Sequence, residues 1–326
     1  MRIYKLLGRL AVKLVVLLVS FTFALPVLAK EINVDGTLYP SLSEAFSHAK
    51  DGSIIKISAG DYQDAAILKA DNVMIIGEPG TRIFGKATKG KGALLIQGTN
   101  TLIKQIECFN IQVRDRNGAC VRLEGKHLIL DNVYFHDSQQ GVLTGAQPGI
   151  VHIINSRFER LGAGGRAHGI YVGGGTLIIE DSQFLSSKGE GHEVKSRAKE
   201  TRIIRSVIAS LSGKDSRLVD VPNGGKLEII ASVLQQGTET SNWNLVGYGL
   251  EDYKYDMNSV TIKDNIFVLD RHANQVLNIK HQRVKPVVEG NIFVGNMQDA
   301  FEAGNMVFKS RESAGLEAAP NLPLLN

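Results

Sequence analysis

The sequence predicts an all-β fold: a solenoid of stacked coils, each made of short parallel strands, with a capping helix at the amino-terminal end. Three observations support this prediction. Apolar segments that end in an aromatic or aliphatic residue recur at a near-constant period along most of the 326 residues. The segments are rich in β-branched residues and alternate with Asn, Asp and Gly, which is typical of strands and turns. A short amphipathic segment precedes the first of them.

The first residues predict an export signal. Four basic side chains precede the apolar run Leu14–Leu25, and Val27 and Ala29 suit a cleavage site. We therefore expect a signal peptide over residues 1–29, and a periplasmic or secreted protein with no stable membrane insertion after cleavage. The apolar run is short for a membrane span, which makes an uncleaved anchor the weaker alternative.

The charge balance argues against a nucleic-acid partner. The chain has 37 Lys and Arg against 33 Asp and Glu, and four of the basic residues lie in the signal. The remaining chain is therefore formally neutral. Proteins that bind nucleic acid present a broad basic surface, so any attraction to an anionic partner must come here from a local cluster of charges.

The capping helix is predicted in the segment SLSEAFSHAK, where Leu42, Ala45, Phe46 and Ala49 share one face. A solenoid needs covered ends, so we expect this face to lie on the first coil. The opening coils follow in the segments DGSIIKISAGDY and NVMIIGEPGTRI.

The repeats supply the remaining coils, about nine in all. Each apolar segment ends at an anchor residue, and successive anchors are 23 to 26 residues apart, except for one step of 33. The anchors are Phe109, Phe135, Phe158, Phe184, Ile208, Leu234, Phe267 and Phe293. A coil buries its apolar face by stacking, which pairs each strand with its counterpart about 4.8 Å away. We expect the solenoid domain over residues 30–305 and a tail or cap over 306–326.

The two cysteines leave two alternatives open. Cys108 and Cys120 are the only cysteines, and an exported protein can keep a disulfide. Two small buried thiols in neighbouring strands are the other interpretation. No Cys and His residues have the spacing of a zinc site.

The order of the helix, DGSIIKISAGDY, a strand and IIGEPG resembles the amino-terminal part of the pectate-lyase-like superfamily. The resemblance extends over about residues 31–300. It implies a single-stranded right-handed parallel β-helix. It leaves the activity open, because this fold carries lyases, epimerases, hydrolases and binding proteins.

A second strand of each coil predicts a stripe of functional side chains. Its central apolar residues face inward, and they are Ile170, Val194, Val219, Val246 and Leu277. Alternation then sends the following residues outward in one stripe: Tyr171, Lys195, Asp220, Gly247 and Asn278. A second outward stripe is predicted at Gly169, Glu193 and Leu218. Arg197 lies on the same face as Lys195, while His168 and His192 begin their strands.

These side chains suit an acidic polysaccharide. A β-helix presents a long shallow groove, and removal of the C5 proton of a uronate needs a cation, a base and an acid. Arg197 fits the substrate carboxylate, Lys195 or His192 the base, and Tyr171 the acid. His168 and Asp220 complete the candidate catalytic residues. β-Elimination and C5 epimerisation share this first step, so both remain open.

A narrower resemblance concerns the segment HEVKSRAKETRIIRSVI. It is similar to a segment of the β-helical alginate and chondroitin lyases, in which a Lys and an Arg carry catalysis near a calcium held by Asn and Glu. The resemblance implies the catalytic Lys at Lys195 and a calcium ligand at Glu193. The accompanying Asn and Glu have no evident counterpart, and neither has the Asp-Pro-His-Asp motif of alginate C5-epimerases. Calcium is thus the one cofactor to consider, and no metal ligand is assigned.

The long step before Phe267 predicts an insertion beside the stripe. It holds Trp243, Tyr248, Tyr253 and Tyr255, and aromatic faces suit stacking on sugar rings. The alternative is a loop that packs its own aromatics against the coil. The candidate substrate-contacting residues are Glu193, Trp243, Tyr248, Asn278 and Lys280.

Each functional interpretation has a structural alternative. Outward charges form ordinary cross-strand ion pairs, and the two histidines fit hydrogen-bonded positions at coil corners. Asn residues beside the anchors predict an inward ladder, at Asn132, Asn155, Asn265 and Asn291. At the level of function, a non-catalytic polysaccharide-binding or surface scaffold is the alternative. A glycoside hydrolase with Glu193 and Asp220 as its carboxylates is third. An open groove at Lys195 and Arg197 would favour function, and burial under the loop at 241–257 would favour structure.

Overall fold

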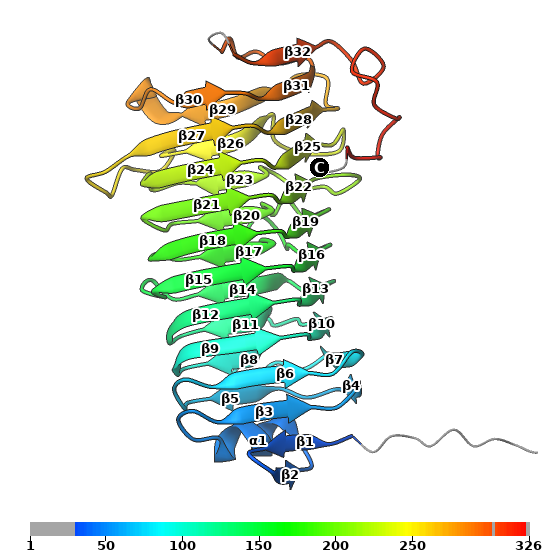
Figure 1. The fold of residues 1–326 in the computed structure, drawn as a ribbon, viewed down its shortest axis with the longest axis vertical. Helices are drawn as coiled ribbons and strands as arrows, with labels where there is room; N and C mark the ends of the chain where they lie inside the picture. The colour runs from blue at the N-terminus through cyan, green and yellow to red at the C-terminus, as the bar shows by residue number, and fades with distance from the viewer. Residues whose placement is uncertain (1–29, 302–303, 324–326) are drawn as a thin grey trace, which may run out of the picture.

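The computed structural model describes residues 30–301 and 304–323 and shows a rod of stacked coils (Figure 1). The predicted signal peptide, residues 1–29, lies outside the described residues. Each full coil contributes one strand to each of three sheets, which we call sheets A, B and C. The coils wind as a right-handed parallel β-helix, as the sequence predicts. No helix of the described residues has the length and apolar character needed to cross a membrane.

Sheet A has 12 strands, in the order β2 (Thr37–Tyr39), β1 (Ile32–Val34), β3 (Ile54–Ile57), β6 (Met74–Gly77), β9 (Thr99–Lys104), β12 (Lys126–Asp131), β15 (Ile150–Ile154), β18 (Thr176–Glu180), β21 (Glu200–Ile204), β24 (Lys226–Ile230), β27 (Ser259–Lys263) and β30 (Val287–Glu289). Sheet B has 11 strands, in the order β32 (Met306–Phe308), β31 (Ile292–Gly295), β28 (Ile266–Leu269), β25 (Val233–Gln236), β22 (Val207–Ala209), β19 (Gln183–Leu185), β16 (Arg157–Glu159), β13 (Tyr134–His136), β10 (Glu107–Phe109), β7 (Thr81–Phe84) and β4 (Gly60–Tyr62).

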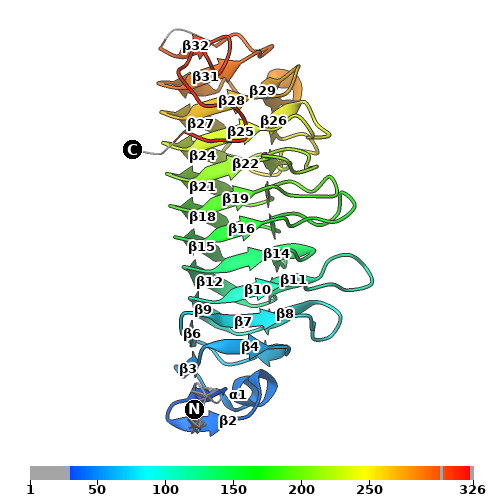
Figure 2. The ribbon, with the colours of Figure 1, turned by 90° about the vertical axis from the view of Figure 1, so that its right-hand side faces the viewer.

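Sheet C has nine strands, in the order β29 (Gln275–Ile279), β26 (Asn244–Tyr248), β23 (Val219–Val221), β20 (Val194–Ser196), β17 (Ile170–Val172), β14 (Gln140–Thr144), β11 (Ala119–Leu123), β8 (Gly92–Ile96) and β5 (Ala66–Leu68). A short 3₁₀ helix, η1 (Lys280–Gln282), follows β29. Most of the longer connections run from sheet B to sheet C and project from one side of the rod (Figure 2), whereas residues 249–258 connect β26 of sheet C with β27 of sheet A. Neighbouring coils pair in parallel, whereas β1 pairs antiparallel with both β2 and β3.

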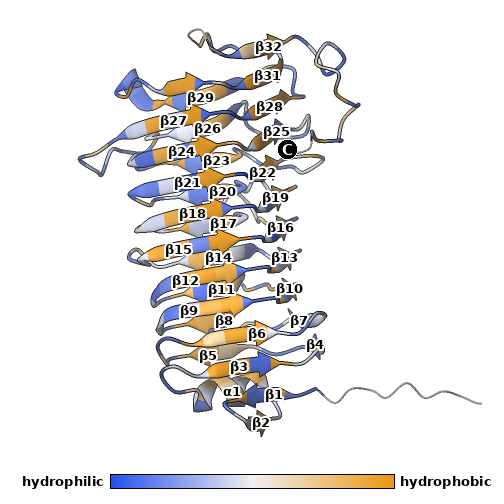
Figure 3. Cartoon of the chain, viewed as in Figure 1, coloured by the Kyte–Doolittle hydropathy of each residue, from blue (hydrophilic) through white to orange (hydrophobic). Residues whose placement is uncertain are grey.

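The core is the stack of inward-facing residues. In Figure 3 the hydrophobic colour concentrates in the strands. The anchors pair in register from Phe135 through to Phe293 and are buried. The first predicted anchor is wrong by one residue. Cys108 takes the inward position beside Phe135, whereas Phe109 lies on the outer face beside His136.

The disulfide explains this shift. Cys108 forms a disulfide with Cys120, so of the two alternatives that the sequence leaves open, the bridge is present. A side chain must point into the coil at position 108 to reach Cys120. Because alternate strand residues point to opposite faces, Phe109 must then point outward.

The polar ladder beside the anchors agrees with the prediction at Asn265 and Asn291 and differs from it in the earlier coils. The inward position is held by Ser156, Ser182, Ser206 and Ser232, then by Asn265 and Asn291, and each side chain accepts a hydrogen bond from the backbone N–H of the preceding coil. Asn132 and Asn155 instead lie one residue earlier, with φ of 54° and 50°. Asn tolerates this left-handed conformation. Because Asn132 and Asn155 do not occupy the inward position, their prediction as inward residues of the ladder is wrong.

The two ends of the rod differ. The helix α1 (Leu42–His48) lies at the amino-terminal end, where it buries Leu42, Ala45 and Phe46 against the first coil. At the other end β32, within the predicted tail, pairs with β31 and continues sheet B. Arg311 then pairs with Asp270 and ties the following segment back along the side of the rod (Figure 1).

Candidate functional site

The outward stripe of sheet C has the predicted register. Tyr171 pairs with Lys195, Lys195 with Asp220, Asp220 with Gly247, and Gly247 with Asn278. Local alternation determines this register, since the inward residues between them stay in the core. The stripe therefore brings a phenol, an ammonium group and a carboxylate side by side.

The second predicted stripe is wrong, because the connections from sheet B cover the beginning of these strands. Glu193 and Leu218 are buried. The carboxylate of Glu193 accepts hydrogen bonds from the backbone N–H of Ser187, at 2.6 Å, and from its hydroxyl, at 2.7 Å. Burial, and then the nearby Asp215 carboxylate, raise the pKa of Glu193. Glu193 is thus enclosed by the connection between β19 and β20 and does not face a groove.

The two predicted histidines form a buried stack with their rings 4.8 Å apart. His168 Nδ1 accepts the backbone N–H of His192, and His192 Nδ1 accepts that of Arg217, both at 3.0 Å. A neutral imidazole that accepts at Nδ1 carries its proton on Nε2. Burial, followed by Lys195 and Arg217, lowers the pKa of His192 to about 3. Neither nitrogen is therefore free to accept a proton, and the hydrogen-bonded alternative describes this pair.

Asp220 lies at the centre of a charge cluster. Its buried carboxylate is 3.4 Å from Lys195 Nζ, 3.2 Å from the Arg217 guanidinium and 3.5 Å from His192 Nε2. Lys195 Nζ also lies 5.6 Å from the centre of the Tyr171 ring. A carboxylate surrounded by several donors is held in one orientation. The cluster is therefore preorganised, with Lys195 between the carboxylate and the aromatic ring.

Arg197 joins this cluster from the same face. Its Nε donates to Tyr171 Oη at 2.6 Å, and one terminal nitrogen donates to Asn223 Oδ1 at 2.8 Å. The two terminal nitrogens also bind both carboxylate oxygens of Glu251, at 2.6 and 2.8 Å. This two-point contact is the geometry that a guanidinium makes with a carboxylate.

The loop after β26 covers the two cations. The side chains of Lys195 and Arg197 are 14% and 21% exposed. Besides the Glu251 contact, Tyr255 Oη donates to the carbonyl oxygen of Arg197 at 2.5 Å. Of the two arrangements that the sequence leaves open, the structure has the covered one. In this conformation the cations are held by the loop, which is the arrangement expected of a structural role.

The insertion places its aromatics differently from the prediction. Trp243 is 42% exposed, as a sugar-stacking role requires. Tyr248 is fully buried and donates to the carbonyl oxygen of Gly225, so it cannot contact a polymer and packs as the alternative describes. Asn278 bonds to Asn244, and Lys280 Nζ donates to the carbonyl oxygen of Glu251 at 2.8 Å.

The calcium ion that the resemblance implies stays an expectation. Over residues 30–301 and 304–323, no three His, Cys, Asp or Glu side chains cluster to hold a metal. Glu193, the predicted ligand, has both carboxylate oxygens occupied by Ser187.

Comparison with known proteins identifies the family. A family model described as right handed beta helix region matches residues 140–312. The chain belongs to this family. No curated protein matches the sequence.

Solved structures resemble this chain at low identity, and the first of them shares its fold. An alginate lyase from Paenibacillus sp. str. FPU-7 superposes with a TM-score of 0.52 and 16% identity, covering 82% of this chain and 94% of that chain. Pectate lyase Pel9A has a TM-score of 0.44 and 13% identity, covering 76% and 73%. A pectin methylesterase from Yersinia enterocolitica has a TM-score of 0.41 and 10% identity, covering 86% and 98%.

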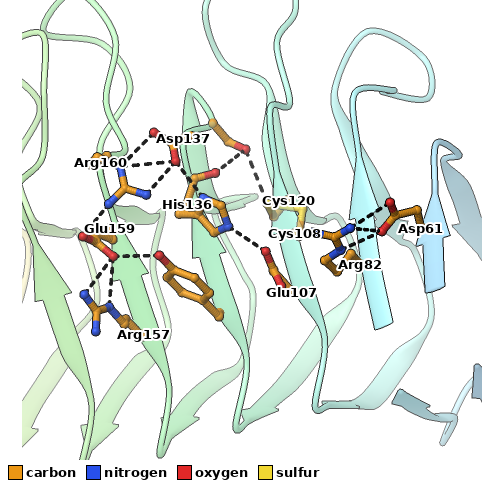
Figure 4. Close-up of polar contacts among 12 residues, drawn as sticks. Asp61, Arg82, Glu107, Cys108, Cys120, His136, Asp137, Arg157, Glu159 and Arg160 are labelled. Carbon is orange, nitrogen blue, oxygen red and sulfur yellow. Dashed lines mark hydrogen bonds and ion pairs between the residues drawn. A yellow bond between two sulfur atoms is a disulfide. The ribbon is translucent and has the colours of Figure 1, made fainter. Parts of the chain in front are cut away.

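The β-helix carries a second polar cluster, on the outer face of sheet B, which the sequence analysis did not predict (Figure 4). His136 is held between Glu107 at 3.1 Å and Asp137 at 2.7 Å. Arg160 pairs with both Asp137 and Glu159. Hydrogen bonds from Arg160 are the main cause that lowers the pKa of Asp137, to about 2. The signal in the sequence was weak, because Glu107, His136 and Glu159 are ordinary outward strand residues, and Asp137 and Arg160 directly follow their strands.

Glu251 is the site residue that sequence reasoning missed. It lies 54 positions from Arg197 and outside the repeat, so no register relates the two. The one signal was indirect: the insertion that contains Glu251 was expected to lie beside the stripe.

Proposed function

We propose that this β-helix binds a uronate polysaccharide along the outer face of sheet C and acts on it as a lyase or a C5-epimerase. One observation carries the proposal: the Arg197 guanidinium holds a carboxylate at two points, beside the Lys195 ammonium and the Tyr171 phenol. A uronate presents the same carboxylate group next to its C5 proton. A shared fold does not determine the activity, because one fold supports many reactions, so the proposal rests on these side chains.

In this mechanism Arg197 binds the uronate carboxylate and stabilises the charge that develops on it. Lys195, in its neutral form, takes the C5 proton, and the C–H electrons pass into the carboxylate as an enolate. In elimination the bond between C4 and the glycosidic oxygen then breaks, a C4–C5 double bond forms, and Tyr171 Oη gives its proton to the departing oxygen. In epimerisation a proton returns to the opposite face of C5.

Lys195 is a better base than the histidines. Both nitrogens of His168 and of His192 are committed, one to a backbone N–H and the other to its own proton. Tyr171 is suited to be the acid because Arg197 Nε donates to its oxygen, which leaves the phenol proton free to point elsewhere.

A binding protein without catalysis is the second candidate. The observation that favours it is the double ion pairing of Lys195, which lies 3.4 Å from Asp220 and 3.9 Å from Glu251. Paired in this way, Lys195 holds the carboxylates of Asp220 and Glu251 in place, which is a positioning role rather than a catalytic one. Glycoside hydrolysis by Glu193 and Asp220 has no support, because Glu193 is buried.

The test uses the wild-type protein, Lys195→Ala and the control Lys126→Ala, an exposed lysine on sheet A. Each is incubated with alginate, pectate, hyaluronan and chondroitin, and the ultraviolet absorbance of the new C4–C5 double bond is followed. A rise with wild type and the control, but not with Lys195→Ala, supports elimination.

Other outcomes separate the alternatives. A flat trace with solvent proton exchange at C5, seen by NMR and lost in Lys195→Ala, supports epimerisation. Binding without exchange, weakened only in Lys195→Ala, supports the scaffold. Absence of binding to all four polymers overturns the proposal.

A further inference from the structure

The Glu251 carboxylate occupies the position on Arg197 that faces out of the cluster. The other partners of the Arg197 guanidinium, Tyr171 and Asn223, are neutral and lie on neighbouring coils. Glu251 reaches in from the loop, its side chain is 52% exposed, and it also approaches Lys195 Nζ at 3.9 Å. The site thus already contains a carboxylate, and it is supplied by the chain itself.

We propose that Glu251 is an internal competitor, which holds the place of a substrate carboxylate on Arg197 until an incoming uronate displaces it. The inference rests on the proposed function, because it concerns how that site is regulated. The ligand class is a polymer with one carboxylate on each sugar ring.

Displacement requires movement of the side chain rather than opening of the loop. The backbone N–H groups of Glu251 and Asp252 both donate to the carbonyl oxygen of Pro222 at 3.1 Å, and that of Lys254 donates to Asn223 at 3.0 Å. Lys280 Nζ holds the carbonyl oxygen of Glu251 from the next coil. These bonds keep the loop in place when the carboxylate rotates out.

The exchange is energetically balanced. The Glu251 side chain is 52% exposed, so water competes for its carboxylate and another carboxylate can replace it on the same guanidinium. Arg197 keeps its bonds to Tyr171 and Asn223 throughout, and therefore stays aligned for the incoming group. Hydrogen bonds from Arg197 lower the pKa of Glu251, which keeps the competitor ionised at neutral pH.

The test compares Glu251→Gln with the control Asp252→Asn. Both remove one negative charge from the same loop, but within the described part of the chain the Asp252 side chain accepts a hydrogen bond only from the backbone N–H of Tyr253. Affinity for a pectate and an alginate hexasaccharide is measured by calorimetry. We expect Glu251→Gln to bind about three- to fivefold more tightly than wild type, and Asp252→Asn to change affinity by less than about 1.5-fold. Glu251→Asp, which keeps the charge but retracts it, should fall between wild type and Glu251→Gln.

The outcomes distinguish this inference from the proposed function. If wild type binds and Glu251→Gln binds equally or more weakly, Glu251 is not a competitor and the inference fails while the function stands. If equal gains appear in both charge variants, the effect is long-range electrostatics and the inference also fails. If no variant binds either oligosaccharide, Glu251 has no ligand to compete with and the inference fails, while the proposed function fails only if hyaluronan and chondroitin are not bound either.

Discussion

Replacing Phe184 by Ala tests the register of the solenoid, with Phe109→Ala as the matched comparison. Phe184 is fully buried, and its ring stacks on that of Phe158 with centroids 4.5 Å apart. A buried Phe removes about 150–250 Å² from water, worth about 4–6 kcal/mol at about 25 cal/mol per Å². Since coils cannot collapse independently, we expect Phe184→Ala to lower the free energy of unfolding by about 4 kcal/mol.

Phe109 is an equally large residue on the opposite face. It is half-buried and stacks between Phe84 and His136, with centroids 5.0 Å from each. Half the buried area and two ring contacts predict a loss of about 1–2 kcal/mol for Phe109→Ala. Guanidinium unfolding followed by circular dichroism measures both. Equal losses for the two variants would refute the assignment of Cys108, rather than Phe109, to the core.

Two further predictions concern stability. Burial raises the pKa of Asp215 from 3.8 to about 7, so between these values the folded state binds more protons than the unfolded chain. The free energy of unfolding, and with it the melting temperature, should therefore fall as pH rises through this window. Asp215→Asn should make the melting temperature depend less on pH, and an unchanged dependence would contradict the assignment to Asp215. Cys120→Ser opens a disulfide that spans 12 residues and should cost about 3 kcal/mol. A reducing agent should lower the melting temperature of wild type equally and leave the variant unchanged.

The sequence predicts this fold well because its signals are local and repeated. Strand alternation sets which residue of each coil faces inward, so the residue pattern alone places the stripe from Tyr171 to Asn278 in its correct register. The single misplaced anchor shows the limit. Phe109 is the more apolar choice, and only the bridge to Cys120 makes position 108 the inward one.

The candidate site was predicted only in part, because loops decide what covers a strand. Alternation places Glu193 outward, yet Ser187 from the preceding connection encloses it. Tyr248 likewise belongs to the aromatic insertion but is fully buried. Glu251 has no periodic relation to Arg197, and their contact exists only after the loop has folded across the coils. Pairings between a repeat and an insertion carry no pattern that a sequence can show.

The two polar clusters of the rod differ in a way that bears on function. On sheet B, His136 and Arg160 pair with carboxylates of the same or a neighbouring coil, at most 29 positions away in the sequence. The charges of this cluster are therefore balanced by residues of the repeat. This is the arrangement of an ordinary structural ion-pair network.

On sheet C, the Arg197 guanidinium meets neutral partners on the neighbouring coils, Tyr171 and Asn223, and these leave its charge uncompensated. The carboxylate that binds it comes from an insertion outside the repeat. Under the proposed function, Arg197 would become available to an anionic sugar when the Glu251 carboxylate moves aside.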